Sequence, residues 1–186
     1  MDFRLFQNLR NRAAVFANRH PGALPLALGT LLGLGLAAGL ADLVRYSDSN
    51  EFCLSCHEMA QAPYQEYLQS THYRNRLGIR AGCADCHLPH DSWLAYAKAK
   101  IAASKDVFHH LAGTLGTPEK FEGLRPEMAR RVWRDLKDSD SAPCRGCHDV
   151  AAMDPEQQGS GHMHQRIGTL GKTCVDCHQG LAHRLR

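Results

Sequence analysis

Eight cysteines are the residues of this chain with the clearest capacity for chemistry. They form four pairs with two residues between the partners, and a histidine follows each pair directly. The motifs are CLSCH at 53–57, CADCH at 83–87, CRGCH at 144–148 and CVDCH at 174–178. This spacing is the signature of covalent attachment of haem c. Two thiols bond the haem, and the adjacent histidine supplies an axial ligand to the iron.

The prediction is therefore four covalently bound haem c groups, with all eight cysteines used. The attachment cysteines are Cys53, Cys56, Cys83, Cys86, Cys144, Cys147, Cys174 and Cys177, and the motif histidines are His57, His87, His148 and His178. Two zinc sites, redox dithiols or an exported disulfide framework would also use cysteine pairs. None of these needs a histidine after every second cysteine.

Four irons have eight axial positions, and the motif histidines fill at most four of them. The other histidines are His20, His72, His90, His109, His110, His162, His164 and His183. His72 and His164 are the preferred distal ligands. His183 stays open between ligation and packing, and His162 between ligation and an exposed loop. Met59, two positions after His57, could reach the first iron in place of that histidine, with packing as the alternative.

An apolar segment precedes the motifs. Residues 21–41, PGALPLALGTLLGLGLAAGLA, carry no charge and are long enough to cross a bilayer, which predicts a transmembrane helix over 21–44. The run exceeds the apolar core of a signal peptide and has no clear cleavage site, so we expect it to be retained. Glycines in this span form small-xxx-small patterns that favour a possible homodimer, although such glycines are also ordinary in spans.

Charge predicts the orientation of this span. Arginines precede it at positions 4, 10, 12 and 19, whereas Asp42, Arg45 and Asp48 follow it. The arginine excess places residues 1–20 in the cytoplasm and residues 45–186 in the periplasm. The predicted localisation is the bacterial inner membrane, with one span and an exported haem domain.

The predicted fold is mainly α with much irregular structure. Helical patterns cover residues 91–113 and a stretch from Pro126 to about Lys137, where the proline would occupy the first helical position. Gly, Pro, Ser and Asp gather at 113–126 and 137–144, which predicts linkers there. They separate two expected dihaem modules, with one haem pair at 53–87 and the other at 144–178.

On these motifs, and on the strings CADCHLPH, ASKDVFHHLAGTLGTPEKFE, TCVDCHQG and AHRL, the chain resembles the NapC/NirT family of membrane-anchored tetrahaem cytochromes c. Within the family it is most similar to the branch that serves periplasmic nitrate reductase. The resemblance implies oxidation of menaquinol or ubiquinol from the membrane pool. The electrons would pass to a periplasmic reductase, favoured to be nitrate reductase with its small cytochrome subunit.

The resemblance also implies roles for individual residues. Met59 matches a ligand of the first haem, His72 a distal ligand of the fourth and His164 a distal ligand of the third. The sixth ligand of the second haem stays open among His109, His110 and Lys100.

Asp106, Lys100 and His90 match positions that line the family's quinol pocket. Quinol oxidation releases protons, so a carboxylate, lysine or histidine is needed there to accept them. Lys100 and Asp106 are six residues apart and point about 120° from one another on a helix. They cannot both face one small ligand unless the helix bends or ends.

Two other functions compete with quinol oxidation. A passive anchor and wire would receive electrons from another membrane protein, and only the matches at Asp106 and Lys100 argue against it. A multihaem reductase of a small nitrogen oxyanion would need an iron with an open position. The spare histidines argue against such a vacancy.

Overall fold

A computed structural model of the chain describes Arg4, Gln7, Val15, residues 19–153, Glu156 and residues 161–184. The chain divides into two compact units, residues 1–47 and residues 48–186. Most of the predicted cytoplasmic segment, residues 1–20, lies outside the described residues.

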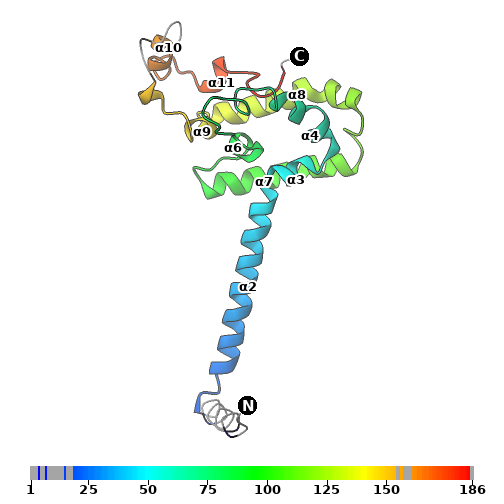
Figure 1. Cartoon of the computed structure of the whole chain (residues 1–186), viewed down its shortest axis with the longest axis vertical. Helices are drawn as coiled ribbons and strands as arrows, with labels where there is room; N and C mark the ends of the chain where they lie inside the picture. The colour runs from blue at the N-terminus through cyan, green and yellow to red at the C-terminus, as the bar shows by residue number, and fades with distance from the viewer. Residues whose placement is uncertain are drawn as a thin grey trace. The chain divides into compact units, whose positions relative to one another are not determined.

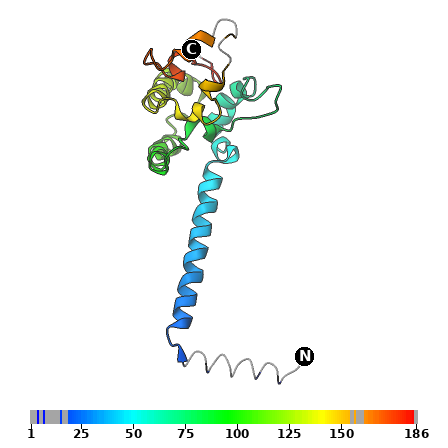
Figure 2. The ribbon, with the colours of Figure 1, turned by 90° about the vertical axis from the view of Figure 1, so that its left-hand side faces the viewer.

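The first unit contains one long apolar helix, α2 (Ala23–Ser47). Its 25 residues are long and apolar enough to cross a membrane, and none of them is buried. Thr30 is the one polar side chain in the apolar stretch of this helix. Its hydroxyl donates a hydrogen bond to the Leu26 carbonyl of the preceding turn at 2.9 Å, so its hydrogen-bonding need is met within the helix. The predicted apolar helix is confirmed, and it extends three residues beyond the predicted end at residue 44. Figures 1 and 2 show it as one continuous helix.

The second unit is built on two long helices, α7 (Trp93–Leu111) and α8 (Pro118–Asp138). Figure 1 shows them lengthwise and Figure 2 shows them nearly end-on, so their axes run in similar directions. The other elements are short: α3 (Asn50–Leu54), α4 (His57–Gln61), α5 (Pro63–Tyr67), α6 (Cys83–His87), α9 (Ala142–Arg145), η1 (Val150–Ala152), α10 (Gly161–Gln165) and α11 (Cys174–Cys177). The predicted helical class is confirmed, since the described part of the chain contains no strand.

Local capping explains the bounds of α7. Ser92, in extended conformation, accepts a hydrogen bond from the Ala95 N–H at 3.4 Å and begins the helix. The helix ends before Gly113, which has a φ of +65° and donates its N–H to the His110 carbonyl at 3.0 Å. The helix predicted over 91–113 is therefore present, two residues shorter at each end.

The helix predicted to begin at Pro126 begins eight residues earlier, at Pro118. Thr117 accepts the Lys120 N–H at 3.3 Å, and Pro118 occupies the first turn, where a proline leaves no helical hydrogen bond unmade. Pro126 lies inside the helix, so much of the linker predicted over 113–126 is helical. The threonine cap followed by proline is a stronger start signal than the later proline alone.

The second unit buries few apolar side chains of its own. Among the described residues these are Tyr67, Leu115, Phe121 and Val175, and the buried polar residues are Glu58, Arg125 and Ser141. So small an apolar set leaves most of the short helices without a hydrophobic partner. Covalently bound cofactors, which the motifs predict, would compensate for so small a core.

Candidate functional site

The cysteine motifs lie on short helices or at their ends. Motif two forms α6, and motif four forms α11. Both carry an aspartate as the third motif residue: Asp85 accepts the Gly82 N–H at 2.6 Å, and Asp176 accepts the Thr173 N–H at 2.8 Å. Each carboxylate caps its helix from within the motif. The resulting turn places both cysteines of a motif on one face, because residues three apart are neighbours on a helix.

The motifs contact one another in chain order. The Cys53 and Cys83 thiols share a hydrogen bond that lowers the pKa of Cys53 to about 7 and raises the pKa of Cys83. Burial and then the Cys144 thiol raise the pKa of Cys86, while burial and then the Cys174 thiol raise the pKa of Cys144. Helix α6 packs against both α3 and α9. The sequence of sites along the chain is therefore also their sequence in space.

The motif histidines of sites two, three and four each face a second histidine from elsewhere in the chain. Two imidazoles on opposite sides of one metal ion have ring centres about 6.4 Å apart, given metal–nitrogen bonds of about 2.0–2.1 Å. The observed ring-centre distances are 6.2 Å for His87 and His183, 6.2 Å for His72 and His148, and 5.8 Å for His164 and His178. Each pair fits the two axial positions of one haem iron.

Burial and hydrogen bonding suit these histidines for metal binding. His183 directs Nδ1 to the Pro63 carbonyl at 3.2 Å, which leaves Nε2 for a metal. His72 has a buried Nδ1 with no hydrogen-bond partner. Partial burial lowers the pKa of His183 and favours the neutral ring that binds metals.

Two of the distal candidates lie beside other motifs than the family resemblance implies. His72 lies beside motif three instead of motif four, and His164 lies beside motif four instead of motif three. Similarity of local strings identifies a ligand by residue type, whereas its iron is chosen by tertiary packing. For motif two, His183 faces the motif histidine, and the three earlier candidates lie elsewhere. Their contacts are His109 with Thr114, His110 with Glu58 and Lys100 with Asp48.

The first motif is built differently from the other three. His57 and His110 have ring centres 5.7 Å apart, but both contact the carboxylate of Glu58. His110 Nδ1 lies 2.9 Å from each Glu58 oxygen, and His57 Nε2 lies 3.5 Å from Oε1. Glu58 is buried, which raises its pKa, yet hydrogen bonds from its own backbone N–H and from His110 lower it to a net value below the usual range. The carboxylate competes with a metal for His57.

A possible metal cluster at the first motif does not form a separate site. Cys56, Glu58 and His110 offer ligand atoms within 4.8 Å of one another. Cys56 is one of the two cysteines predicted to attach the first haem, and its thiol would be used in that bond. Met59 follows in the same short helix, α4, with its backbone N–H bonded to the Cys56 carbonyl at 3.1 Å.

The three predicted quinol-pocket residues are not brought together. Lys100 pairs with Asp48 at 2.5 Å, Asp106 pairs with Arg131 at 3.2 Å, and His90 Nε2 lies 3.2 Å from the Ala84 carbonyl. Lys100 and Asp106 therefore face different partners, as their separation on the helix predicts. Asp106 is half-exposed.

Lys100 belongs to a polar cluster beside the first motif. Tyr96, one turn earlier on α7, donates its hydroxyl to both oxygens of Asp48 at 2.8 and 2.9 Å. Burial and this hydrogen bond raise the pKa of Tyr96 to about 12. Lys100 and Asp48 also act electrostatically on the Cys53 thiol. We call Asp48, Tyr96 and Lys100 the Asp48 cluster.

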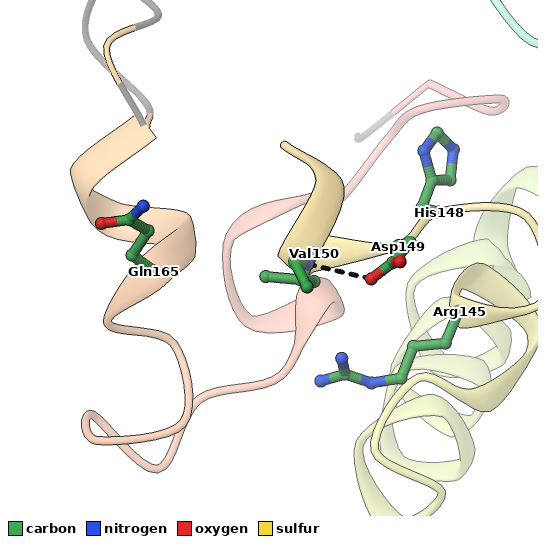
Figure 3. Close-up of a pocket in the computed structure, with 6 residues that line it drawn as sticks. Arg145, His148, Asp149, Val150 and Gln165 are labelled. Atoms are coloured by element: carbon green, nitrogen blue, oxygen red, sulfur yellow. Dashed lines mark hydrogen bonds between the residues drawn. The ribbon is translucent and has the colours of Figure 1, made fainter. Parts of the chain in front are cut away.

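A cavity of about 600 Å³ lies beside motif three (Figure 3). Its lining residues are Arg145, His148, Asp149, Val150, Ala151 and Gln165. Asp149 accepts the Ala151 N–H at 2.9 Å and shapes one wall, as the dashed line in Figure 3 shows. The volume is in the range of cofactor sites, and the motif histidine forms part of the lining.

Sequence reasoning missed Glu58, Asp48 and Tyr96. Glu58 had a local signal, because it follows a motif histidine directly. Asp48 and Tyr96 had none, since their contact joins residues that are far apart in the sequence.

Comparisons with known proteins agree with the motifs. The profile described as "NapC/NirT cytochrome c family, N-terminal region" matches residues 18–186. Cytochrome c-type protein NapC of Escherichia coli (strain K12) is 44% identical over 168 residues, covering 86% of this chain and 84% of that protein. Denitrification system component NirT of Stutzerimonas stutzeri is 36% identical over 186 residues, covering 96% of this chain and 92% of that protein.

A third relative is longer than this chain. Cytochrome c-type protein TorY of Escherichia coli O157:H7 is 42% identical over 165 residues, which cover 87% of this chain and 44% of that protein. The comparison with solved structures gives no match.

Proposed function

The chain belongs to the NapC/NirT cytochrome c family, and from this premise we propose that it is a tetrahaem quinol dehydrogenase that feeds a periplasmic terminal reductase. Membership in the family implies covalently bound haem c and a role in electron transfer. What we propose beyond family membership is that the chain carries four haems, oxidises quinol and passes the electrons to a periplasmic reductase. Four attachment motifs and a candidate membrane span support it.

The observation that carries the proposal is the contact of the four motifs in chain order. When bound, each haem supplies an iron that takes up and releases one electron. The chain's own contribution is to fix the attachment points so that neighbouring cofactors lie side by side. A row of four such sites is an arrangement for moving electrons along the protein, from motif one to motif four.

We assign the axial ligands from the ring pairs. His87 and His183 would hold the second haem, His72 and His148 the third, and His164 and His178 the fourth. Met59 would hold the first haem, because the His57 ring contacts the Glu58 carboxylate instead. The first haem would then have a different ligand set and a less crowded second face, which suits the entry point for electrons.

Quinol oxidation needs groups that take protons from the two hydroxyls. The Asp48 cluster lies beside the first motif and offers a carboxylate held by Lys100 and Tyr96. A hydroxyl hydrogen-bonded to Asp48 could pass its proton to that carboxylate and then to water. Asp106 and His90 remain candidates through the family resemblance. Asp106 would serve from nearer the second motif, since its charge acts on His87.

The proposed location is the bacterial inner membrane, with α2 as the span, residues 1–20 in the cytoplasm and residues 45–186 in the periplasm. The arginine excess before the span supports this orientation. A homodimer through the glycines of α2 is a further proposal. Added Cβ atoms at Gly29, Gly33, Gly35 and Gly39 would meet nothing within 4 Å. The pair Gly29 and Gly33 lies about 120° around the helix from the pair Gly35 and Gly39, so each pair leaves room for another helix on its own face.

We propose nitrate reductase, with a small cytochrome subunit, as the acceptor. The strings that resemble the nitrate reductase branch and the similarity to NapC support this choice. Similarity to NirT and TorY supports a wider set of periplasmic reductases. The alternatives are a passive electron-transfer anchor and a multihaem reductase of a small nitrogen oxyanion. The paired histidines at three sites speak against an open iron there.

The test is to mix the purified full-length protein, in detergent and without oxygen, with a menaquinol or ubiquinol analogue. We expect the haem absorption bands to become reduced. A passive anchor would stay oxidised until a second membrane protein is added. A nitrite or hydroxylamine reductase would turn over those oxidants when supplied with dithionite, whereas the proposed donor would not.

Replacing Asp106 with asparagine is expected to slow this reduction about tenfold at unchanged haem content. The effect should be smaller than the roughly 10²–10⁴-fold of a fully engaged general base, because a half-exposed carboxylate can be replaced in part by water. Stopped-flow absorbance measures the rate. Asp135→Asn, an exposed carboxylate on α8, is the control. Unaltered kinetics in Asp106→Asn would remove this residue from the quinol site.

A further inference from the structure

Glu66 joins three separate parts of the chain through one carboxylate that is mostly shielded from solvent. Its Oε2 accepts a hydrogen bond from Arg125 Nη1 at 2.8 Å and another from the Arg184 backbone N–H at 2.9 Å. Arg125 is held from its other side by Glu122, at 2.8 and 2.7 Å. The Arg125 and Glu66 side chains are only 8% and 10% exposed. The ion pair is therefore largely shielded from solvent, and Glu66 Oε2 accepts two hydrogen bonds.

This ion pair fastens the C-terminal segment to helix α5. Glu66 binds the backbone of Arg184, and the carbonyl of Pro63, on the same helix, lies 3.2 Å from Nδ1 of His183. Two successive residues of the segment are thus fixed to one short helix. The backbone bond sets the position of the segment, and the ring contact sets the orientation of the histidine. Both act on the imidazole that faces His87 at a ring-centre distance of 6.2 Å.

Packing alone does not hold this segment in place. Between residues 176 and 184 no side chain is buried, and Leu181 is 45% exposed. A segment with so few buried contacts needs other contacts to fix its position. The contacts to Pro63 and Glu66 supply that tie.

General stability is a weak explanation for the pair. Desolvating two charges costs several kcal/mol, and a buried ion pair is often no more stabilising than apolar residues of similar volume. The planar guanidinium group of Arg125 binds two carboxylates, those of Glu66 and Glu122. Such an ion pair fixes the direction of its partners, and this is its main contribution to the structure. In metal sites, groups that hydrogen-bond to a metal ligand commonly hold that ligand in the orientation needed to bind the metal.

We propose that Glu66 and Arg125 are positioning residues that hold His183 in place as the sixth ligand of the second haem. The inference rests on the proposed ligand pair of His87 and His183. Glu66 acts on the iron only through the C-terminal segment, and Arg125 only through Glu66. The C-terminus thereby becomes part of the second haem site, although it lies far from motif two in the sequence.

The test replaces Glu66 with alanine in the full-length protein and counts haem spin states. We expect one haem that is low-spin in the unaltered protein to become high-spin in the electron paramagnetic resonance spectrum and, after reduction with dithionite, to bind carbon monoxide. Haem content by pyridine haemochrome should stay at four per chain. Glu127→Ala, an exposed glutamate on α8, is the matched control and should leave all spin states unchanged.

Two further variants separate positioning from general destabilisation. His183→Ala should convert the same single haem, and the double variant Glu66→Ala/His183→Ala should convert no second one. Glu66→Gln should retain more of the low-spin signal, because its amide oxygen can still accept the Arg184 N–H. An unchanged number of low-spin haems in Glu66→Ala, the loss of more than one of them or a fall in haem content would overturn the proposal. Dithionite reduces the haems in every variant, so a protein that fails to oxidise quinol can still pass this test.

Discussion

Electrons from a quinol analogue should stop at the first haem when Cys83 and Cys86 are both replaced by serine. The variant loses the second attachment site, which lies between the first and the third. We expect three haems per chain by mass spectrometry and complete reduction of all three by dithionite. Quinol should reduce only about one of them on the stopped-flow timescale, because the gap left by the second haem separates the first from the rest.

The matched control is the same substitution at the end of the row. Cys174→Ser/Cys177→Ser removes the fourth site, which has a motif neighbour on one side only among the described residues. This variant should also hold three haems, but quinol should reduce all of them. Equal reduction in the two variants would show that electrons do not follow the order of the motifs. Four haems in either variant would contradict the assignment of its cysteines.

Replacing Lys100 with methionine is expected to slow reduction by quinol about 100-fold, the low end of general acid–base effects. Lys100 holds the Asp48 carboxylate at 2.5 Å beside the first motif. Without the ammonium group, the carboxylate loses the cation that fixes it as a partner for the quinol hydroxyl. Methionine keeps the length and the apolar stem of the side chain. The rate is measured by stopped-flow absorbance in detergent, after haem content is confirmed.

Lys98→Met provides the control on the same helix, because Lys98 is exposed. It should reduce the rate little, and Asp48→Asn should reproduce the Lys100→Met result. If Lys98→Met and Lys100→Met slow the reaction equally, the effect is a general loss of positive charge. If neither slows it, protons leave the quinol elsewhere, and Asp106 becomes the stronger candidate.

The contact network also bears on the expected division into two dihaem modules. The second motif touches the third through Cys86 and Cys144, and His72, which precedes motif two, faces His148 of motif three. These contacts cross the boundary between the two predicted pairs. The division into modules stays a prediction, and a continuous row of four sites describes the observed contacts.

Local chemistry made several features predictable from the sequence. Covalent haem attachment needs two thiols and a histidine within five residues, so the motif itself contains the site. The apolar helix depends on the composition of one continuous stretch, and α2 confirms it. The start of α8 could also have been predicted, since Thr117 and Pro118 form a local cap.

The tertiary structure alone decided which residues meet. His183 faces His87, and Lys100 meets Asp48, because the chain folds back on itself across long sequence separations. Residue type identified His183 and His164 as possible ligands but could not choose an iron for them. A ligand or ion-pair partner is selected by distance and direction in space, and neither quantity is written in the spacing of residues along the chain.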